Sequence, residues 1–446
     1  MSTVPNAVAA DEERVLEFKP AFLRRVRIRG YKSIAFCDVT LEPLTILVGR
    51  NRAGKSNFLD ALAFVRDAME TNIPEAVRRH GGWKSILSRF AQDGEVSFEL
   101  EIALPPDGRD PLDLTPGEMN AVEYGFALRE GPTGTPMLTR ERFHSPGGDG
   151  IAACEYRLAG TFDERKSAAS YEWDFNHPEV DCSAVPHPHP DRLWLGSFAE
   201  QPFAATTAGL RFMRSYNFDP RVIRPPQKRE PETLLTANGQ NLASVIESVE
   251  ALDRNAIRRV RDYLRAIDRS IDTFWVARDG EYETIRFRYL PVGTNPGLEL
   301  DAVGMADGVL RALGCFVAVF QSKKKYGAPS LVGIDELETS LHPRAMYVLE
   351  SAFRESILRT QILIATHSSK LLDCPDVRLE EVRVVSMIDG ETTIGPLDDG
   401  SVEIIRRGWS SLGKLHHEQQ LERDPVVPRK ATGERGLHST PKESVR

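Results

Sequence analysis

Residues 47–57 contain the residue types that bind a polyphosphate. They read LVGRNRAGKSN and fit the pattern G-x-x-x-x-G-K-[ST] without departure. Glycines in such a loop let backbone N–H groups turn toward phosphate oxygens, and a helix that begins there adds positive charge. Lys55 can bridge the β- and γ-phosphates of a nucleotide, and Ser56 can offer its hydroxyl to Mg²⁺. The candidate ATP-binding residues are Gly49, Arg50, Asn51, Arg52, Ala53, Gly54, Lys55, Ser56 and Asn57.

The segments on either side of this loop have the patterns of a strand and a helix. Residues 44–48 form an apolar run, which is typical of a buried strand. After the loop, apolar residues recur at helical spacing: Phe58, Leu59, Leu62, Ala63 and Val65. Strand, glycine loop and helix, in this order, are the context that the motif requires. A chance glycine turn is the alternative interpretation, and these flanks argue against it.

Two later apolar runs end in residues that can act on a bound nucleotide. Residues 330–336 read as a strand that ends in Asp335 and Glu336. An Asp in this place holds the Mg²⁺ shell, so Asp335 and Ser56 are the candidate metal ligands. Glu336 can orient and polarise the attacking water, although an ordinary strand cap is the alternative. The run at 361–366 ends in His367, a candidate γ-phosphate sensor because the end of a parallel strand points into the ligand crevice. Glu336 and His367 are thus the candidate catalytic residues.

Composition restricts the class of protein. The chain has 446 residues, of which 41% are hydrophobic and 27% charged, as in a soluble globular protein of two or three domains. Apolar runs are too short for a membrane span, and the N-terminus lacks the pattern of a secretory signal. Five scattered cysteines without a C-x-x-C pair predict a reduced, cytoplasmic setting and neither disulfides nor zinc. The net charge of −8 argues against a generally basic nucleic-acid binder.

The first half of the chain predicts strands around the loop. Residues 22–28 and 36–41 read as strands that precede it, and residues 96–104 and 122–128 alternate between apolar and polar side chains. Shorter candidates follow at 154–158 and 171–175. Residues 184–192 contain the run Pro-His-Pro-His-Pro, which favours a stiff exposed connector. Its two histidines could instead bind a metal, but no cysteine or third histidine lies nearby in the sequence.

A row of arginines lies on a predicted helix in the middle of the chain. Residues 242–251 and 255–267 read as helices, and residues 284–290 as a strand. The second helix has one apolar face and, opposite it, arginines about one turn apart. The candidate DNA-contacting residues are Arg254, Arg258, Arg261 and Arg265. The alternative is a solvated helix face in which Asp262 and Asp268 neutralise part of the charge.

Together, residues 49–56, 334–343 and 366–368 resemble the ABC-type ATPases of the RecF/SMC and OLD (overcoming lysogenization defect) group. They are most similar to stand-alone ATPases of the AAA-21 type, and the resemblance covers roughly residues 22–100 and 295–420. It implies an α/β fold: a P-loop NTPase head of the ABC type with a mixed or parallel sheet, an antiparallel β region and an inserted helical lid. It also implies Mg²⁺ and a homodimer that encloses two ATP molecules, each between the phosphate loop of one subunit and the signature loop of the other.

The resemblance places the signature loop at residues 304–311, with Ala306, Asp307 and Gly308 acting in trans. The family pattern is approximately L-S-D-G-T-x-R, so Ala306 stands where a serine hydroxyl normally reaches the partner's γ-phosphate. Its loss removes a charge-assisted hydrogen bond of ~1.5–3 kcal/mol, which implies slow hydrolysis or weak dimerisation. Gln92 is a candidate for the family's glutamine loop by position.

The resemblance also bears on domains and partners. We expect a flexible tail (1–18), the N-terminal half of the head with its β subdomain (19–180), an inserted linker and helical lid (181–292), the C-terminal half (293–421) and a disordered tail (422–446). The chain has no room for the Toprim nuclease domain of OLD-like proteins, so a nuclease or toxin effector would be encoded separately. The implied function is ATP hydrolysis in which nucleotide-driven dimerisation controls DNA repair or anti-phage defence. The alternative is a weakly or non-hydrolysing, ATP-gated scaffold that holds a separate effector.

Overall fold

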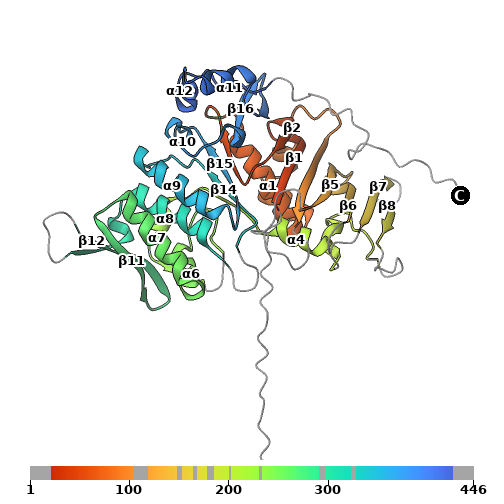
Figure 1. The fold of residues 1–446 in the computed structure, drawn as a ribbon. Helices are drawn as coiled ribbons and strands as arrows, with labels where there is room; N and C mark the ends of the chain where they lie inside the picture. Colours follow the sequence, from red (N-terminus) through yellow and green to blue (C-terminus); the bar gives the residue numbers. More distant parts are fainter. Residues whose placement is uncertain are drawn as a thin grey trace, which may run out of the picture.

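The computed structural model describes residues 22–104, 119–147, 153–163, 168–177, 185–199, 202–230, 234–290, 297–322 and 328–424. In these residues the chain forms a central sheet, a larger antiparallel sheet on one side of it, and a lid of helices and strands on the other (Figure 1). The expected tail at 1–18 and most of the one at 422–446 lie outside the described residues, while Arg423 still bridges to Leu397. No helix of the described part is both long and apolar enough to cross a membrane.

The central sheet has the strand order β17-β16-β3-β15-β14-β9. Its strands are β3 (Leu44–Val48), β9 (Met213–Tyr216), β14 (Leu331–Asp335), β15 (Gln361–Thr366), β16 (Val382–Ile388) and β17 (Glu391–Gly395). The neighbouring strands from β16 to β9 in this order pair in parallel. The strand β17 follows a turn at Asp389 and Gly390 and pairs antiparallel with β16 at the edge of the sheet. Every residue of β3 and β15 is buried, because parallel strands are covered on both faces.

The two faces of this sheet belong to two separate cores. On one face, Leu47, Leu331 and Leu363 pack with α1 (Lys55–Glu70) and the antiparallel sheet. On the other face, Ile46 and Ile364 pack with α8 (Asp307–Phe320), α9 (Pro343–Ser356) and the lid. Alternate side chains of a strand point to opposite faces. One short strand can therefore join both cores.

The antiparallel sheet has the order β2-β1-β4-β5-β6-β7-β8 and confirms the strands predicted by alternation. Its strands are β1 (Phe22–Tyr31), β2 (Ile34–Thr40), β4 (Glu95–Leu104), β5 (Asn120–Glu130), β6 (Pro136–Ser145), β7 (Cys154–Asp163) and β8 (Ala168–Asn176). The strand β6 was not predicted, because its centre reads Thr-Arg-Glu-Arg and the alternation fails there. Short helices α2 (Ile73–Arg79), α3 (Trp83–Ile86) and α4 (Phe203–Arg211) complete this half.

A buried carboxylate explains the charged residue at the centre of β6. Glu141 accepts hydrogen bonds from Tyr124 (3.0 Å) and Tyr156 (2.9 Å) and from the backbone N–H groups of Trp194 (2.6 Å) and Leu195 (2.9 Å). Burial raises the pKa of Glu141 to about 6. The 3-10 helix η4 (Trp194–Ser197) is thereby fixed to the sheet. The connector that precedes η4 is attached to the same helix, since the Trp194 indole donates to the Pro186 carbonyl at 2.7 Å.

The described part of the proline-rich connector, residues 185–192, is at least partly exposed throughout and contains neither helix nor strand. His187 packs edge-on against Trp173, and His189 pairs with Asp191. Within the described residues, no group of three or more His, Cys, Asp or Glu side chains could hold a metal ion. The described part of the connector packs along the antiparallel half, where its Pro190 carbonyl accepts from the Leu138 N–H at 2.8 Å and its Asp191 carbonyl from the Ile73 N–H at 2.7 Å.

The lid is built from strands as well as helices. It contains β10 (Gln227–Lys228), α6 (Leu242–Leu252), α7 (Arg254–Ile267), β11 (Ile271–Asp279), β12 (Tyr282–Tyr289) and β13 (Leu298–Asp301). The expected range of 181–292 differs from this arrangement, because β9 within it belongs to the central sheet and β13 lies beyond it. The helix α7 docks on the head through Tyr263, which stacks on Phe316 and donates to Glu355 at 2.7 Å.

Candidate functional site

The phosphate loop joins β3 to α1 as the sequence predicts. Gly49 follows β3 where a Cβ would lie 2.1 Å from the Val385 carbonyl oxygen, so the loop can pass β16 only as glycine. Gly54 has a φ of 107°, and its Cβ would lie 1.9 Å from the Thr392 hydroxyl oxygen. The loop therefore passes closely against β16 at Gly49 and against β17 at Gly54, and Lys55 then begins the helix.

A chain of side-chain hydrogen bonds supports the loop from outside. The Thr392 hydroxyl donates to the Ala53 carbonyl at 2.9 Å and lies 2.7 Å from the Ser33 hydroxyl. Asn57 donates to the same Ser33 hydroxyl at 2.6 Å. The side-chain amide of Asn57 therefore links α1 to the turn between β1 and β2. A phosphate contact of the Asn57 side chain stays a prediction.

Lys55 lies over the loop and faces the acids of the neighbouring strands. Its ammonium donates to the carbonyls of Gly49 (2.8 Å) and Arg50 (3.0 Å), and the residue is 8% exposed. Burial lowers the pKa of Lys55, and the negative charges of Glu338 and Asp335 oppose that shift. A cation held in this way is stabilised by an anion that enters the loop, because few water molecules compete for it.

Parallel pairing brings the predicted strand ends to one edge. Thr366 of β15 pairs with Val48 of β3, and Asp335 of β14 pairs with Ala365 of β15. The loop, Asp335 and His367 therefore follow the carboxyl ends of three adjacent parallel strands. This edge is where open α/β sheets bind their ligands.

Ser56 and Asp335 form the candidate magnesium site. The Ser56 side chain lies close enough to Asp335 to lower the pKa of that carboxyl, which opposes the larger rise that burial causes. A hydroxyl beside a partly buried carboxylate gives two oxygen ligands, and Mg²⁺ takes its remaining ligands from phosphates and water. The donor set fits Mg²⁺ bound together with a nucleotide.

Glu336 occupies an unusual backbone position directly after the strand. Its φ is 52°, in the left-handed region that non-glycine residues rarely adopt, and its side chain is exposed. Its backbone N–H donates to Asp335 at 3.1 Å. The turn therefore directs Glu336 away from the strand while Asp335 stays at the sheet edge. The roles of Asp335 as a metal ligand and of Glu336 as a base stay predictions.

A further acid, Glu338, fixes the candidate sensor His367. The Glu338 carboxylate accepts from the backbone N–H of His367 at 3.0 Å, and it also bonds the Nδ1 atom of the same residue and the Thr366 hydroxyl. Glu338 is largely buried, with 13% of its side chain exposed. Sequence reasoning did not assign it a role. The available signal was the D-E-x-E spacing, which places it two residues after Glu336.

The structure also shows which residue lies beside Asp335 on the other side. Tyr216, the last residue of β9, pairs with Ile334 of β14 in parallel register. Asn217 therefore lies level with Asp335 at the sheet edge, and it is exposed. Gln92, the candidate for the family's glutamine loop, lies in the loop before β4 in the other sheet, and its assignment stays a prediction. The sequence does not predict the short β9, because four residues show too little periodicity to be recognised as a strand.

The signature residues lie at the start of α8. Ala306 is the N-cap of this helix and makes no side-chain capping bond, as expected for alanine in place of serine. Arg224 pairs with Asp307 at 2.5 Å and donates to the Met305 carbonyl at 2.9 Å. A Cβ on Gly308 would lie 2.4 Å from the Ser340 carbonyl oxygen. The helix start is thus held against the turn that follows Asp335 and Glu336.

The arginine row divides into two pairs. Arg261 donates to the Phe274 carbonyl (3.3 Å) and to Glu250 (2.8 Å), and Arg265 bonds the Asp272 carbonyl (2.5 Å) and Asp262 (3.0 Å). Both side chains therefore bond other residues of the lid and stabilise its fold. Arg254 and Arg258 are exposed, and in the described part of the chain neither has an ion pair.

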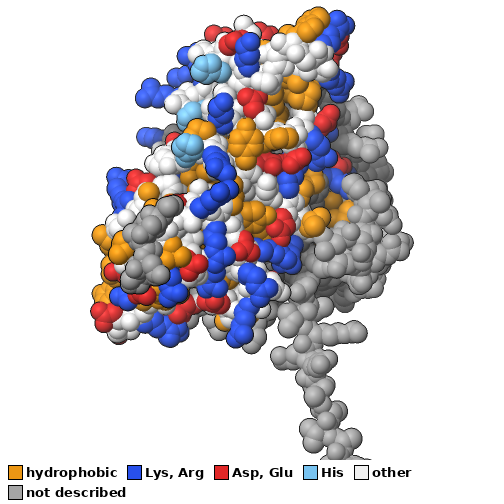
Figure 2. Space-filling model, turned by 60° about the vertical axis from the view of Figure 1, so that its left-hand side comes forward, with side chains coloured by type: hydrophobic (Ala, Val, Ile, Leu, Met, Phe, Trp, Pro, Cys, Tyr) orange, Lys and Arg blue, Asp and Glu red, His pale blue; other side chains and the backbone are white. Residues whose placement is uncertain are grey.

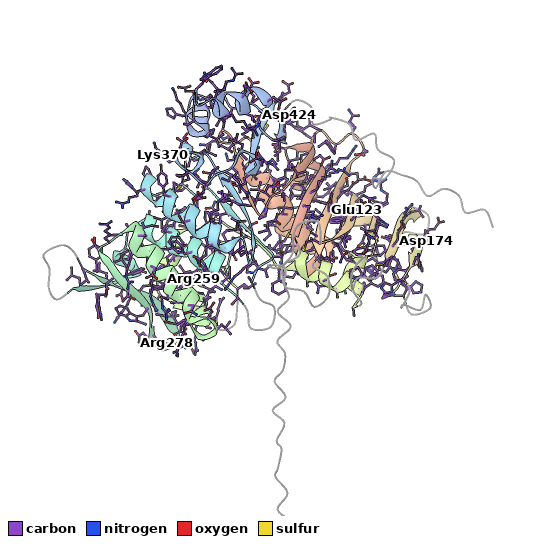
Figure 3. All side chains as sticks on the ribbon, in the orientation of Figure 1. Glu123, Asp174, Arg259, Arg278, Lys370 and Asp424 are labelled. Carbon is purple, nitrogen blue, oxygen red and sulfur yellow. The ribbon has the colours of Figure 1, made fainter. Side chains whose placement is uncertain are left out.

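Figure 2 shows a broken column of basic side chains on the side of the molecule that carries the lid, with acids beside it. The labelled Arg259 and Arg278 in Figure 3 lie on the lid, on the opposite side from Glu123 and Asp174. Both are paired with acids: Arg259 with Glu355 at 2.9 Å, and Arg278 with Glu247. Much of this basic surface is therefore locally neutralised.

Comparisons with known proteins agree with the geometry. The family model AAA_21, described as "AAA domain, putative AbiEii toxin, Type IV TA system", matches residues 44–373. The DNA replication and repair protein RecF of Thermosynechococcus vestitus is 26% identical over 132 residues, which make up 27% of this chain and 35% of that protein. The chain thus matches only about a third of that relative's length.

Solved structures similar to the chain include SMC heads. One, bound to the C-winged helix domain of ScpA, has a TM-score of 0.45 and 13% identity, with 85% of this chain and 99% of that chain covered. The SMC head domain from Thermotoga maritima has a TM-score of 0.40 and 12% identity, with 84% of this chain and 99% of that chain covered.

Replacing Lys55 with alanine should weaken ATP binding at least tenfold, since a charge-assisted contact to the phosphates is lost. The variant should stay folded, because it removes a buried cation rather than a packed apolar side chain. Equilibrium binding of a fluorescent ATP analogue measures the first effect, and circular dichroism the second. Lys84→Ala, at an exposed lysine, is the control. Equal affinities for Lys55→Ala and the native chain would contradict the assignment of the loop.

Proposed function

The chain belongs to the AAA_21 family, and on that premise we propose that it hydrolyses ATP to ADP and phosphate. The observation that carries the proposal is the parallel register of β3, β15 and β14, which brings Asp335 to the edge that carries the phosphate loop, with Glu336 in the next position. It places a loop hydroxyl, a metal-binding carboxylate and a second carboxylate at the edge where Lys55 lies. Phosphoryl transfer needs this combination of positioning and charge rather than covalent chemistry by the protein.

Each residue then has a defined task. The curved backbone from Gly49 to Ser56 binds the phosphates, and Lys55 moves its donors from the loop carbonyls to the β- and γ-phosphate oxygens. When bound, Mg²⁺ at Ser56 and Asp335 supplies positive charge to the same oxygens. Glu336 accepts a proton from the water whose oxygen attacks the γ-phosphorus, as the bond to the β-phosphate oxygen breaks and ADP leaves.

His367 completes the site on the γ-phosphate side. Because Glu338 bonds its Nδ1 atom, Nε2 is the ring nitrogen that can donate to a phosphate oxygen. Asn217, level with Asp335 on the next strand, is the polar group that would complete the shell of water around the metal. Both residues act by position, which suits a reaction whose transition state spreads negative charge over several oxygens.

We also propose that the site is completed by a second copy of the chain. The start of α8 offers backbone N–H groups to an anion, as helix N-termini do. Gly308 packs on the turn after Glu336 in the same subunit, so nucleotide bound at one site can orient the surface presented to the partner. Two heads would then close on two ATP molecules, and reopening after hydrolysis would move the lids.

DNA is the proposed substrate of this movement, in repair or in defence against phage. Support comes from the curated relative, which is named as a DNA replication and repair protein, and from the exposed Arg254 and Arg258 on the lid. These two residues lie about one helical turn apart, a spacing similar to that of phosphates along one strand. They can follow a backbone without reading bases.

One observation favours a second function, a scaffold that binds ATP without rapid turnover and holds a separately encoded nuclease or toxin. The N-cap at Ala306 lacks the hydroxyl that would reach the partner's nucleotide. The acids at 335 and 336 favour the enzyme instead. Steady-state phosphate release, measured with and without DNA, separates the two functions.

Glu336→Gln should preserve ATP binding and lower turnover by about 100-fold or more, because the amide keeps the shape and loses the base. With hydrolysis blocked, the closed dimer should accumulate. Phosphate release and sedimentation at saturating ATP and Mg²⁺ measure both effects. Glu403→Gln, at an exposed acid of α11 (Asp399–Arg406), is the control. Undiminished turnover would exclude Glu336 as the base, and a monomeric Glu336→Gln would contradict the closed dimer.

Replacing Arg254 and Arg258 together with glutamate should weaken DNA binding and lower the salt slope by about 2, one unit for each lost phosphate contact. Basal ATP turnover should not change. Filter binding across a salt series provides the measurement. A matched control changes Arg157 and Arg192, which are 59% and 70% exposed on the other half of the molecule, by the same four charge units. Equal affinity and slope for the lid variant and native protein would show that DNA binds elsewhere.

A further inference from the structure

The C-terminal helix α12 (Leu412–His417) takes no part in the site described so far, yet it lies beside it. In Figure 1 it lies with α11 above α10 (Ser369–Leu372), which begins directly after His367 and Ser368. Ser411 caps the helix by accepting from the Lys414 N–H at 3.1 Å. Leu412 and Leu415 are buried beneath it. This short helix is therefore anchored to the head.

A glycine sets the distance between α12 and α10. A Cβ on Gly413 would lie 2.2 Å from the Ser369 carbonyl oxygen and 2.4 Å from the Asp373 carboxylate. The Gly413 N–H also donates to Asp373 at 2.8 Å. Since no other residue could approach so closely, the backbone of α12 is held directly against the segment that leaves the candidate sensor.

His416, one turn further along α12, reaches the sensor itself. Its Nε2–H donates to the main-chain carbonyl of His367 at 3.2 Å. Burial lowers the pKa of His416, with smaller effects from the neighbouring charges that include Lys55. Lys414 and His417, on the same helix, are exposed.

We propose that His416 is a positioning residue for nucleotide hydrolysis, and that α12 holds His367 in place for the γ-phosphate. The inference rests on the proposed ATPase function. Glu338 binds the side chain and N–H of His367, and His416 binds its carbonyl, so the residue is fixed from both sides. A movement of α12 would break the hydrogen bond to the His367 carbonyl and allow His367 to move. The position of α12 is therefore a point of control over turnover.

The test compares full-length variants by steady-state ATP turnover. His416→Ala should lower kcat about tenfold and leave KM unchanged, since a positioning hydrogen bond is lost and no nucleotide contact is. His416→Gln should recover most of kcat, because its carboxamide N–H can reach the same carbonyl. Gly413→Ala, which pushes α12 away, should lower kcat similarly. His417→Ala, at the exposed neighbour, should match the native protein.

Three results would overturn the proposal: a kcat for His416→Ala within twofold of native, an equal loss in His417→Ala, or no recovery in His416→Gln. Should the native chain fail to turn over ATP, the proposed function fails, and the role of His416 is decided by hydrogen exchange without nucleotide. Faster exchange of residues 366–372 in His416→Ala, restored in His416→Gln, would then support the clamp on His367. Unchanged exchange would refute it.

Discussion

The parallel alignment of β3, β15 and β14 is the constraint on which the site depends. Parallel strands have all their carboxyl ends at one edge of the sheet. The phosphate loop, Asp335 and His367, which are far apart in sequence, therefore meet there when the register is correct. The register is set by the pairing of Val48 with Thr366 and of Ala365 with Asp335. A slip of one residue would turn each side chain to the opposite face and so into the core where it does not fit.

That register is protected by packing on both sides of the sheet. A Cβ on Gly333 would lie 2.9 Å from Leu59 of α1 and 3.0 Å from Ser215 of β9, so β14 has space for no side chain there. On the opposite face, Ile334 and Ile364 pack in the core shared with α8 and α9. The helix that carries Lys55 and the helix that carries the signature are thus held by the same strands.

Local patterns in the sequence predict the parts of the site that lie within single segments. The phosphate loop, the Asp335-Glu336 pair and His367 each occupy a few consecutive residues, and the predicted strands that lead to them are confirmed as β3, β14 and β15 of the central sheet. Glu338, Asn217 and His416 acquire their positions from contacts between distant segments. A four-residue strand such as β9 has too little periodicity to be recognised, and no spacing rule relates Gly413 to the Ser369 carbonyl. Tertiary contacts, rather than local propensity, define those residues.

The central claim is that one chain supplies the acids and the phosphate loop while a second copy completes the site. Phosphate release measured over a range of protein concentrations, at saturating ATP and Mg²⁺, tests it most directly. The account predicts a rate per subunit that rises with protein concentration and then levels off as dimers form. A measurable rate per subunit that stays constant while sedimentation shows monomers throughout would contradict it.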